Sequence, residues 1–456
     1  MKIGRIMNRM IKHSDVTRVR QALRNMFAML LLGLVILAGC QGQNILEVVF
    51  PQESEGENIS PATEEATADV AATEEATPSP PEIFDLIMWV PPQFDPNGDS
   101  ESAKLLNSQL KGFLRENPQV NLEVRVKAAS GPGSILDTLS NAVGVAPEAV
   151  PSLILLSRED LIQAVNKKLV YPFEDAAIID ESDWYEFSQE MGIMQGAAYG
   201  LPFVSNIPGL IYRGEQTIGA ALEWEEIGRN FDQLIIPAGD PDAELTSSLY
   251  LSAGGVLLDQ QGMATLDIIT IAEVLEIFAD LQGEGILLPA STEFQTDEQT
   301  WQYFIENDIE AAISSSNRVI SSELDLNLAM LPLFKGTSYT PANGWLWCLT
   351  DPSEFNRKAA ADLAEYLVLA DFLDDWAPVS GYLPVRPSSL SGYSNVDFRE
   401  TVSGMLLSAR LQPKTQEAQR VYAEIRTAVI EIITDQSTPQ EAAERALERL
   451  EVVETQ

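Results

Sequence analysis

From residue 83 onward the sequence alternates between short apolar strands and amphipathic helices, and this alternation constrains the fold more than any other feature. Residues 83–90 are nearly all apolar and rich in β-formers, which is typical of a strand covered on both faces. Strands are also predicted at 120–126 and 153–156, and helices at 102–116, 135–145 and 159–167. Repeated strand–helix–strand units indicate parallel strands with crossover helices, so we expect an α/β fold.

The later part of the chain contains more helices. Because one hydrophobic core stops growing at about 250–300 residues, we expect the 456 residues to form two lobes. Ligands of parallel sheets bind beyond the carboxyl ends of the strands, which directs attention to the segments after residues 89 and 156. Apolar spacing predicts helices at 271–282, 297–306, 357–369, 415–433 and 439–450, and short strands at 210–212, 311–314 and 328–331.

The N-terminus has the pattern of a lipoprotein signal. A basic stretch precedes an uncharged apolar run of 14 residues, 26–39, which is shorter than the roughly 20 residues of a membrane-spanning helix. The run ends in Leu-Ala-Gly-Cys40, which resembles the lipobox where bacterial lipoproteins are acylated and cleaved. We therefore expect a signal peptide at 1–39 and a lipid on Cys40; a plain membrane anchor is the alternative.

Residues 40–81 have the composition of a disordered acidic tether. They are rich in Thr, Glu and Pro, and the phrase Ala-Thr-Glu-Glu-Ala-Thr occurs at 62–67 and again at 72–77. Such a segment has too little apolar surface to form a core, and its like charges keep it extended. We expect it to hold the folded part away from the membrane.

Charge and histidine content exclude several classes of function. The formal net charge is −39, and 22 basic against 67 acidic side chains follow residue 39, so the mature surface repels nucleic acid. The single histidine, His13, lies in the predicted signal peptide. Without an imidazole, Ser-His-Asp and Cys-His nucleophiles and His-based metal sites cannot be built. We predict no catalytic residue, no metal, no cofactor and no nucleic-acid partner.

Two further features are expected to be structural. Cys348 lies in an apolar stretch, which indicates a buried thiol. Residues 95–101 alternate oxygen-bearing side chains like a calcium loop, but Ser100 stands where the loop needs glycine and Leu106 where it needs glutamate. We therefore expect a turn that caps the following helix.

Short phrases recur in a fixed order along residues 83–450. They are the strand ending in Trp89, the stretch 113–120, Gly-Leu-Pro-Phe-Val-Ser-Asn206 with Gly-Leu-Ile-Tyr212, the stretch 331–336, Gly-Trp-Leu-Trp347, Gly-Tyr-Leu-Pro384 and the helix start at 438–443. In this order they resemble the solute-binding proteins of ABC importers, in particular the carbohydrate-type family 1 that includes maltose-binding protein. Each phrase is weak alone, but their order behind a lipobox makes the resemblance specific. The resemblance implies a two-lobed, type II periplasmic-binding-protein-like fold with crossing strands and a ligand cleft between the lobes.

The resemblance assigns residues 82–203 and 333–383 to lobe 1, and residues 204–332 and 384–456 to lobe 2. It implies a monomer, lipid-anchored at the outer face of the cytoplasmic membrane, that captures a sugar or oligosaccharide by hinge closure and delivers it to permease subunits. Polyols, glycerol phosphate, polyamines and peptides are alternative solutes. Two other functions stay open, a secreted glycan-acting enzyme with a carboxylate pair and a surface sensor or scaffold.

The residues that the resemblance places at the cleft follow predicted strand ends or crossings. Aromatic faces stack on sugar rings, and amides, hydroxyls and arginines hydrogen-bond the sugar hydroxyls. Core packing is the alternative for Trp89, hinge packing for Tyr382, and local pairing with Glu159 or Asp160 for Arg158. The loop 315–318 lacks the aromatic residue of several family members, so Arg318 could bind a carboxylate instead, and an acidic sugar stays open. The predicted cleft residues are Trp89, Gln93, Ser157, Arg158, Asn206, Ser315, Ser316, Asn317, Arg318, Trp345 and Tyr382.

Overall fold

The computed structural model describes residues 83–145, 149–174, 182–214, 218 and 221–454. By its contacts the chain divides into two units, Met1–Thr77 and Pro78–Gln456, and the description concerns the second. The predicted signal peptide, the predicted tether and Cys40 lie outside the described residues. None of the described helices combines the length and the apolar character needed to cross a membrane.

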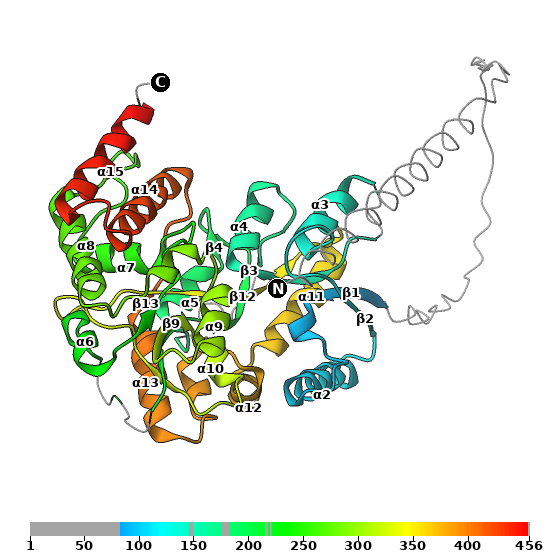
Figure 1. Cartoon of the computed structure of the whole chain (residues 1–456). Helices are drawn as coiled ribbons and strands as arrows, with labels where there is room; N and C mark the ends of the chain where they lie inside the picture. Colours follow the sequence, from blue (N-terminus) through cyan, green and yellow to red (C-terminus); the bar gives the residue numbers. More distant parts are fainter. Residues whose placement is uncertain (1–82, 146–148, 175–181, 215–217, 219–220, 455–456) are drawn as a thin grey trace, which may run out of the picture. The chain divides into compact units, whose positions relative to one another are not determined.

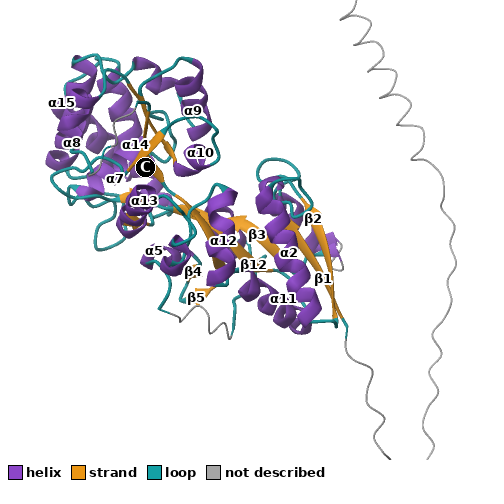
Figure 2. Cartoon of the chain, turned by 90° about the horizontal axis from the view of Figure 1, so that it is seen from below, coloured by secondary structure: helices purple, strands orange, loops and turns teal. Residues whose placement is uncertain are grey.

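A five-stranded sheet organises the first lobe (Figure 2). Strand β1 is parallel to β2 and β3, as the strand–helix alternation predicts, and β12 runs antiparallel to its two neighbours, β3 and β6. The predicted strands and helices between residues 83 and 167 are confirmed to within one residue. The strands lie in the order β2 (Val120–Val126), β1 (Phe84–Val90), β3 (Leu153–Ser157), β12 (Asn343–Leu349) and β6 (Leu201–Asn206).

The core of this lobe lies on both faces of the sheet. The first four residues of β3, Leu-Ile-Leu-Leu, are all buried, because helices cover both faces. Met88 and Trp347 are fully buried, and so is Cys348, as predicted; burial raises the pKa of its thiol. The covering helices are α2 (Glu101–Glu116), α3 (Ile135–Val145), α4 (Arg158–Asn166), α11 (Glu354–Leu367) and α12 (Ala370–Ser380).

A four-stranded sheet and a group of helices form the second lobe. Helices α8, α14 and α15 pack against one another (Figure 1) and bury apolar residues such as Phe278, Tyr422 and Ile425 in one cluster. The predicted elements of this part are confirmed to within four residues. The sheet has the order β10 (Asn327–Ala329), β7 (Pro208–Tyr212), β9 (Ala311–Ser315) and β8 (Leu234–Ile235), and the helices are α8 (Ile268–Gly283), α9 (Asp297–Glu306), α14 (Gln416–Ile433) and α15 (Pro439–Glu454).

The chain passes between the two sheets at several points. Strand β6 of the first sheet and β7 of the second are separated by one fully buried residue, Ile207. Strand β11 (Thr340–Pro341) leads back into β12 and pairs in parallel with β13 (Ala409–Arg410). A further segment passes Leu383, whose backbone pairs with Ser205. Two α/β lobes joined by crossing segments make this the type II binding-protein-like fold that the sequence predicts.

Two local outcomes have a clear physical basis. The turn before α2 is a helix cap, as predicted, because the Ser100 hydroxyl accepts a hydrogen bond from the backbone N–H of Ala103 at 3.1 Å. Helix α7 (Glu244–Ser252) has no counterpart among the predicted helices. Its Thr246, Ser247 and Ser248 are buried, so its polar residues do not mark a solvent face and the usual periodicity is missing.

Candidate functional site

The carboxyl ends of β1, β3 and β6 and the amino end of β12 meet at one edge of the five-stranded sheet. In register, Trp345 of β12 lies opposite Ser157 of β3, and Asn343 lies opposite Asn206 of β6. Gly344 permits this pairing, because a Cβ atom there would lie 2.4 Å from the Val204 carbonyl oxygen. The edge is therefore the place where the strand-end rule expects a ligand.

An aromatic group forms one part of this edge. The rings of Tyr382 and Trp345 pack on Phe94, with centroids at 5.2 and 5.3 Å. Burial raises the pKa of the Tyr382 hydroxyl, and hydrogen bonds from the side chains of Gln93 and Trp345, followed by the charge of Arg318, oppose that shift. The structure thus brings three predicted residues, Gln93, Trp345 and Arg318, together around a fourth, Tyr382. Trp345 is half-buried and Gln93 is exposed.

Trp89 is a core residue. Its ring is 3% exposed, belongs to the hydrophobic core of the first lobe, and has the Lys127 ammonium 5.1 Å from its centroid. This is the core position that the sequence offers as the alternative for Trp89.

The loop after β9 holds the second set of predicted residues. Arg318 on α10 (Ser316–Ile320) donates from Nε to Asp297 at 2.8 Å and pairs through Nη1 with Glu298 at 2.6 Å. Desolvation would lower the pKa of Arg318, but the two carboxylates outweigh it and the pKa is raised. Asp297 also accepts from the Ser315 backbone N–H at 2.8 Å. Arg318 is therefore neutralised by the protein itself.

Neighbouring polar groups of this loop are less fully satisfied. The Ser316 hydroxyl lies 3.5 Å from Oδ1 of Asn206, at the limit of hydrogen bonding. The Oδ1 atom of Asn317 is buried and has no hydrogen-bond donor within the described part of the chain. These three side chains can accept or donate hydrogen bonds to a polyhydroxylated solute.

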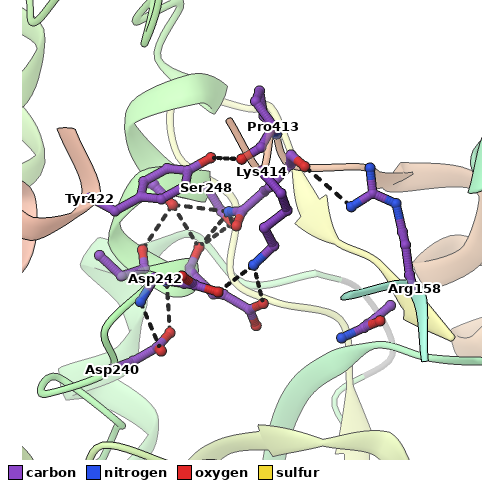
Figure 3. A network of polar contacts seen from close by, with 12 residues as sticks. Arg158, Asp240, Asp242, Ser248, Pro413, Lys414 and Tyr422 are labelled. Atoms are coloured by element: carbon purple, nitrogen blue, oxygen red, sulfur yellow. Dashed lines mark hydrogen bonds and ion pairs between the residues drawn. The ribbon is translucent and has the colours of Figure 1, made fainter. Parts of the chain in front are cut away.

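A polar network surrounds residues 411–413, which follow the crossing strand β13 (Figure 3). Three consecutive backbone carbonyls in this segment accept side-chain hydrogen bonds. The donors to residues 411, 412 and 413 are the hydroxyl of Tyr339, Nη1 of Arg158 and the hydroxyl of Tyr422, at 2.9, 3.4 and 2.8 Å. Side chains from three different elements thus fix one short stretch of backbone.

Lys414 neutralises the acidic start of α7. Its ammonium pairs with Asp242 and lies 3.6 Å from Glu244, and its side chain is only 15% exposed (Figure 3). Burial raises the pKa of Glu244 to about 7, Lys414 opposes the shift, and Asp240 and Asp242 add to it. Glu244 is consequently protonated in part at neutral pH. Among the residues described, no group of three or more His, Cys, Asp or Glu side chains is arranged to hold a metal ion.

Arg158 has no such carboxylate. Within the described part of the chain, its hydrogen bond is the 3.4 Å contact to the Gln412 carbonyl, and its buried Nε atom has no acceptor. Desolvation lowers the pKa of Arg158, while the more distant Tyr339, Tyr422 and Glu190 favour the charged form. Ser157 directly before it caps α4, because its hydroxyl accepts from the Asp160 N–H at 3.1 Å. The local ion pairs with Glu159 or Asp160 are not formed.

A small cavity of about 10 Å³ lies between these groups, lined by residues from both lobes. This volume holds about one water molecule, so a solute cannot enter unless the walls separate. The lining residues are Arg158, Glu159, Glu244, Pro341, Ala342, Asn343, Gln412 and Lys414.

Comparison with known proteins identifies the family. A model of the bacterial extracellular solute-binding protein family matches residues 113–398, more than half of the chain. The chain belongs to this family. The predicted resemblance is confirmed at this level, and membership implies a location outside the cytoplasm. No curated protein sequence matches the chain.

Solved structures of solute-binding proteins share this fold at low sequence identity. The maltose-binding periplasmic protein of Listeria monocytogenes, in complex with maltose, has a TM-score of 0.65 and 13% identity, covering 81% of this chain and 98% of its own. The cyclic α-maltosyl-1,6-maltose binding protein of Arthrobacter globiformis has 0.63 and 16%, covering 81% and 99%. The GacH receptor of Streptomyces glaucescens, in unliganded and acarbose-bound forms, has 0.60 and 16%, covering 80% and 97%.

Several residues at the site of this solute-binding protein were not predicted from the sequence. They are Glu190, Glu244, Tyr339, Gln412, Lys414 and Tyr422. A signal existed for two groups: the acidic run at 240–244, and the Gln-Pro-Lys phrase directly before the predicted helix at 415–433. Neither follows a predicted strand of the first lobe, so the strand-end rule does not reach them.

Proposed function

We propose that this protein is the substrate-binding lipoprotein of an ABC importer and that its solute is a sugar or oligosaccharide. Family membership supports solute binding, and the structurally similar proteins named above bind maltose, cyclic maltosyl-maltose and acarbose. The observation that carries the proposal is that incompletely satisfied polar groups from both lobes line one cavity at the strand ends. Arg158 and Gln412 are the clearest members.

We place lobe 1 at residues 82–203 and 333–383, and lobe 2 at residues 204–332 and 384–456. Opening and closing would occur at the crossings, where single residues such as Ile207 separate the two sheets. The cavity of about 10 Å³ supports this, because a solute could reach Arg158 and Gln412 only after the lobes separate. Closure around the solute would then create the form that the permease subunits recognise.

The predicted cleft residues take different parts in this proposal. Trp345 and Tyr382 would stack on sugar rings, with Gln93 beside them. Hydrogen bonds to hydroxyls would come from the group around Asn206, in which Oδ1 of Asn317 has no donor among the described residues. The members of that group are Ser157, Asn206, Ser315, Ser316 and Asn317.

Anchoring would depend on Cys40, which would become the first residue after signal-peptide cleavage. The acidic tether would then hold the binding domain at the outer face of the cytoplasmic membrane. Incorporation of labelled palmitate into the full chain, and its loss in Cys40→Ser, tests this part independently of solute binding.

A glycan-acting enzyme is the second candidate, favoured by one observation. Glu159 and Glu244 line the same cavity, and burial raises the pKa of Glu244 to about 7. Glycosidases use a carboxyl group of raised pKa together with a second carboxylate. Lys414, however, already pairs with the Glu244 carboxylate, which supports binding over catalysis.

A thermal-shift screen of the full chain in mild detergent tests the proposed function. A ligand that binds only the folded state at 100 times its dissociation constant adds about 2.7 kcal/mol, so we expect a rise of several degrees in Tm with at least one carbohydrate. Trp345→Ala should reduce this shift, whereas Ile269→Ala, at an exposed position, should not. Absence of a shift with every carbohydrate would contradict the proposal, and products on long incubation would favour the enzyme.

A further inference from the structure

Arg158 occupies a position that disfavours a cation. Helix α4 begins at Arg158, and the positive end of a helix dipole favours acidic residues over a cation there; Glu159 and Asp160 are the acidic residues of this first turn. The guanidinium gains no carboxylate in return, and its Nε atom is buried without an acceptor among the described residues. Arg158 is half-buried, and a partly desolvated charge without a paired carboxylate costs stability. The positive charge of Arg158 is therefore not balanced by a paired carboxylate of the described residues.

Gln412 has the complementary feature, a buried acceptor that needs a donor. Its side chain is 3% exposed. Its Nε2 atom donates to the Glu244 carbonyl at 3.0 Å and lies within hydrogen-bond distance of the Ser247 and Ser248 hydroxyls. The Glu244 carbonyl can only accept, which fixes the orientation of the amide. The Oε1 atom of Gln412 is left buried, with no donor in the described part of the chain.

Both residues line the same cavity, so one ligand can satisfy them together. A bound water molecule would supply the two hydrogen bonds but no charge. Lys414 and Arg318 are neutralised by the protein, Lys414 by Asp242 and Arg318 by Asp297 and Glu298. Glu190 acts on Arg158 only through space. Glu159 and Glu244 also line the cavity, but no ion pair joins either of them to Arg158 among the described residues. The buried atoms left unsatisfied there are Nε of Arg158, which needs an acceptor, and Oε1 of Gln412, which needs a donor.

Building on the proposed function, we infer that the solute is an acidic carbohydrate, a uronate, whose carboxylate binds Arg158 and whose neighbouring hydroxyl donates to Oε1 of Gln412. A planar guanidinium binds a carboxylate through two parallel hydrogen bonds, which a neutral hydroxyl cannot reproduce. Seating the carboxylate requires the lobes to open, because the cavity of about 10 Å³ holds one oxygen-sized group.

Titration calorimetry with a matched pair of probes tests this inference on the full chain in mild detergent. The probes are trigalacturonate and the same trisaccharide with its carboxylates methyl-esterified, with maltotriose as a neutral reference. We expect the acid to bind at least about 10-fold more tightly than its ester, since a hydrogen bond to a charged group is worth roughly 10- to 100-fold.

Variants assign the effect to the residue. Arg158→Gln should abolish the preference for the acid, and Arg158→Lys, which keeps the charge but not the planar fork, should keep part of it. Arg229→Gln, an arginine on an exposed surface of the second lobe, is the matched control and should bind like the wild type. Circular dichroism and Tm of each variant show that it is folded.

The outcomes separate the inference from the proposed function. Binding of maltotriose or the ester without preference for the acid would overturn the uronate while leaving carbohydrate binding intact. An acid preference that survives Arg158→Gln in a folded protein would overturn the role of Arg158. Failure of every carbohydrate, acidic or neutral, to bind would overturn both.

Discussion

Two arginines stand in similar local settings and in opposite chemical states. Each follows a buried strand, β3 or β9, and lies in the first turn of the helix that comes next. Arg318 contacts Asp297 at 2.8 Å and Glu298 at 2.6 Å. Arg158 has one hydrogen bond of 3.4 Å to a backbone carbonyl and a buried Nε without an acceptor in the described chain.

A position just after a strand end does not by itself leave a cation available to a ligand. What separates the two sites is a carboxylate supplied by another element, since Asp297 lies at the start of α9, away from the loop that it neutralises. Arg318 is therefore used to organise the protein, and Arg158 remains available.

Removing the carboxylate that saturates Arg318 should have the largest effect. Asp297 accepts from Arg318, from the Ser315 N–H and from the Ser314 hydroxyl, so Asp297→Asn weakens three contacts at once. We expect a loss of about 2 kcal/mol in the free energy of unfolding, measured by urea denaturation. The control Asp308→Asn, whose side chain is 88% exposed beside Arg213, should cost less than about 0.5 kcal/mol. Equal losses in the two variants would remove the basis for calling Arg318 saturated.

Removing Arg318 itself should be somewhat less costly. Arg318→Met leaves Asp297 and Glu298 without their partner, but both are partly exposed and can be hydrated. We expect a loss of about 1 to 2 kcal/mol in urea denaturation. A variant as stable as the wild type would show that the pair contributes nothing, and the contrast with Arg158 would fail.

The protonation state of Glu244 bears on the charge of Arg158, because an ionised carboxylate beside the cavity would partly compensate that charge. Its pKa is raised from 4.5 to about 7 in the folded protein, so the folded state binds more protons than the unfolded chain between those values. Stability from this group is complete below about pH 4.5 and falls as the pH rises toward 7. Glu244→Gln should match the wild type near pH 5 and exceed it by roughly 1–3 °C in Tm near pH 8. Parallel Tm profiles of the two proteins would contradict the raised pKa.

Removing Arg158 should have the smallest effect on stability. Arg158→Met deletes a half-buried cation that forms no ion pair among the described residues, so we expect a change of less than about 0.5 kcal/mol, or a slight gain, in the same denaturation measurement. We therefore expect Arg158→Met to reduce the affinity for the solute and to leave the free energy of unfolding nearly unchanged. A loss as large as that of Arg318→Met would mean that Arg158 has a structural partner and is not held for a ligand.

The sequence predicts the architecture well, because the relevant signals are local. The alternation from β1 to α4 and the helical spacing of α9, α14 and α15 depend on residues near one another in the chain, and these elements were predicted closely. Helix α7 was not predicted, because its buried face carries serines and a threonine and therefore lacks the apolar spacing of a typical helix.

The site is only partly predictable, since its charges are balanced over long distances in sequence. The rule that ligands bind beyond strand ends, with the family resemblance, predicts Arg158, Trp345 and the loop after β9. It does not reveal that Lys414 pairs with Asp242, 172 residues away, or that the Gln412 amide is fixed by α7. Such pairings depend on how the two lobes fold back on the crossing segments, which no local pattern records.

Hydrogen exchange of the full chain, measured with and without the carbohydrate that gives the largest thermal shift, tests whether both lobes form one solute site. A solute held between the lobes should slow exchange together in residues 157–166 of the first lobe and residues 244–252 and 409–415 beside the cavity. The same solute concentration should give half-maximal protection in all three segments, because one closure event protects them. Protection confined to one lobe, or binding without protection of any of these segments, would contradict a solute site formed by both lobes.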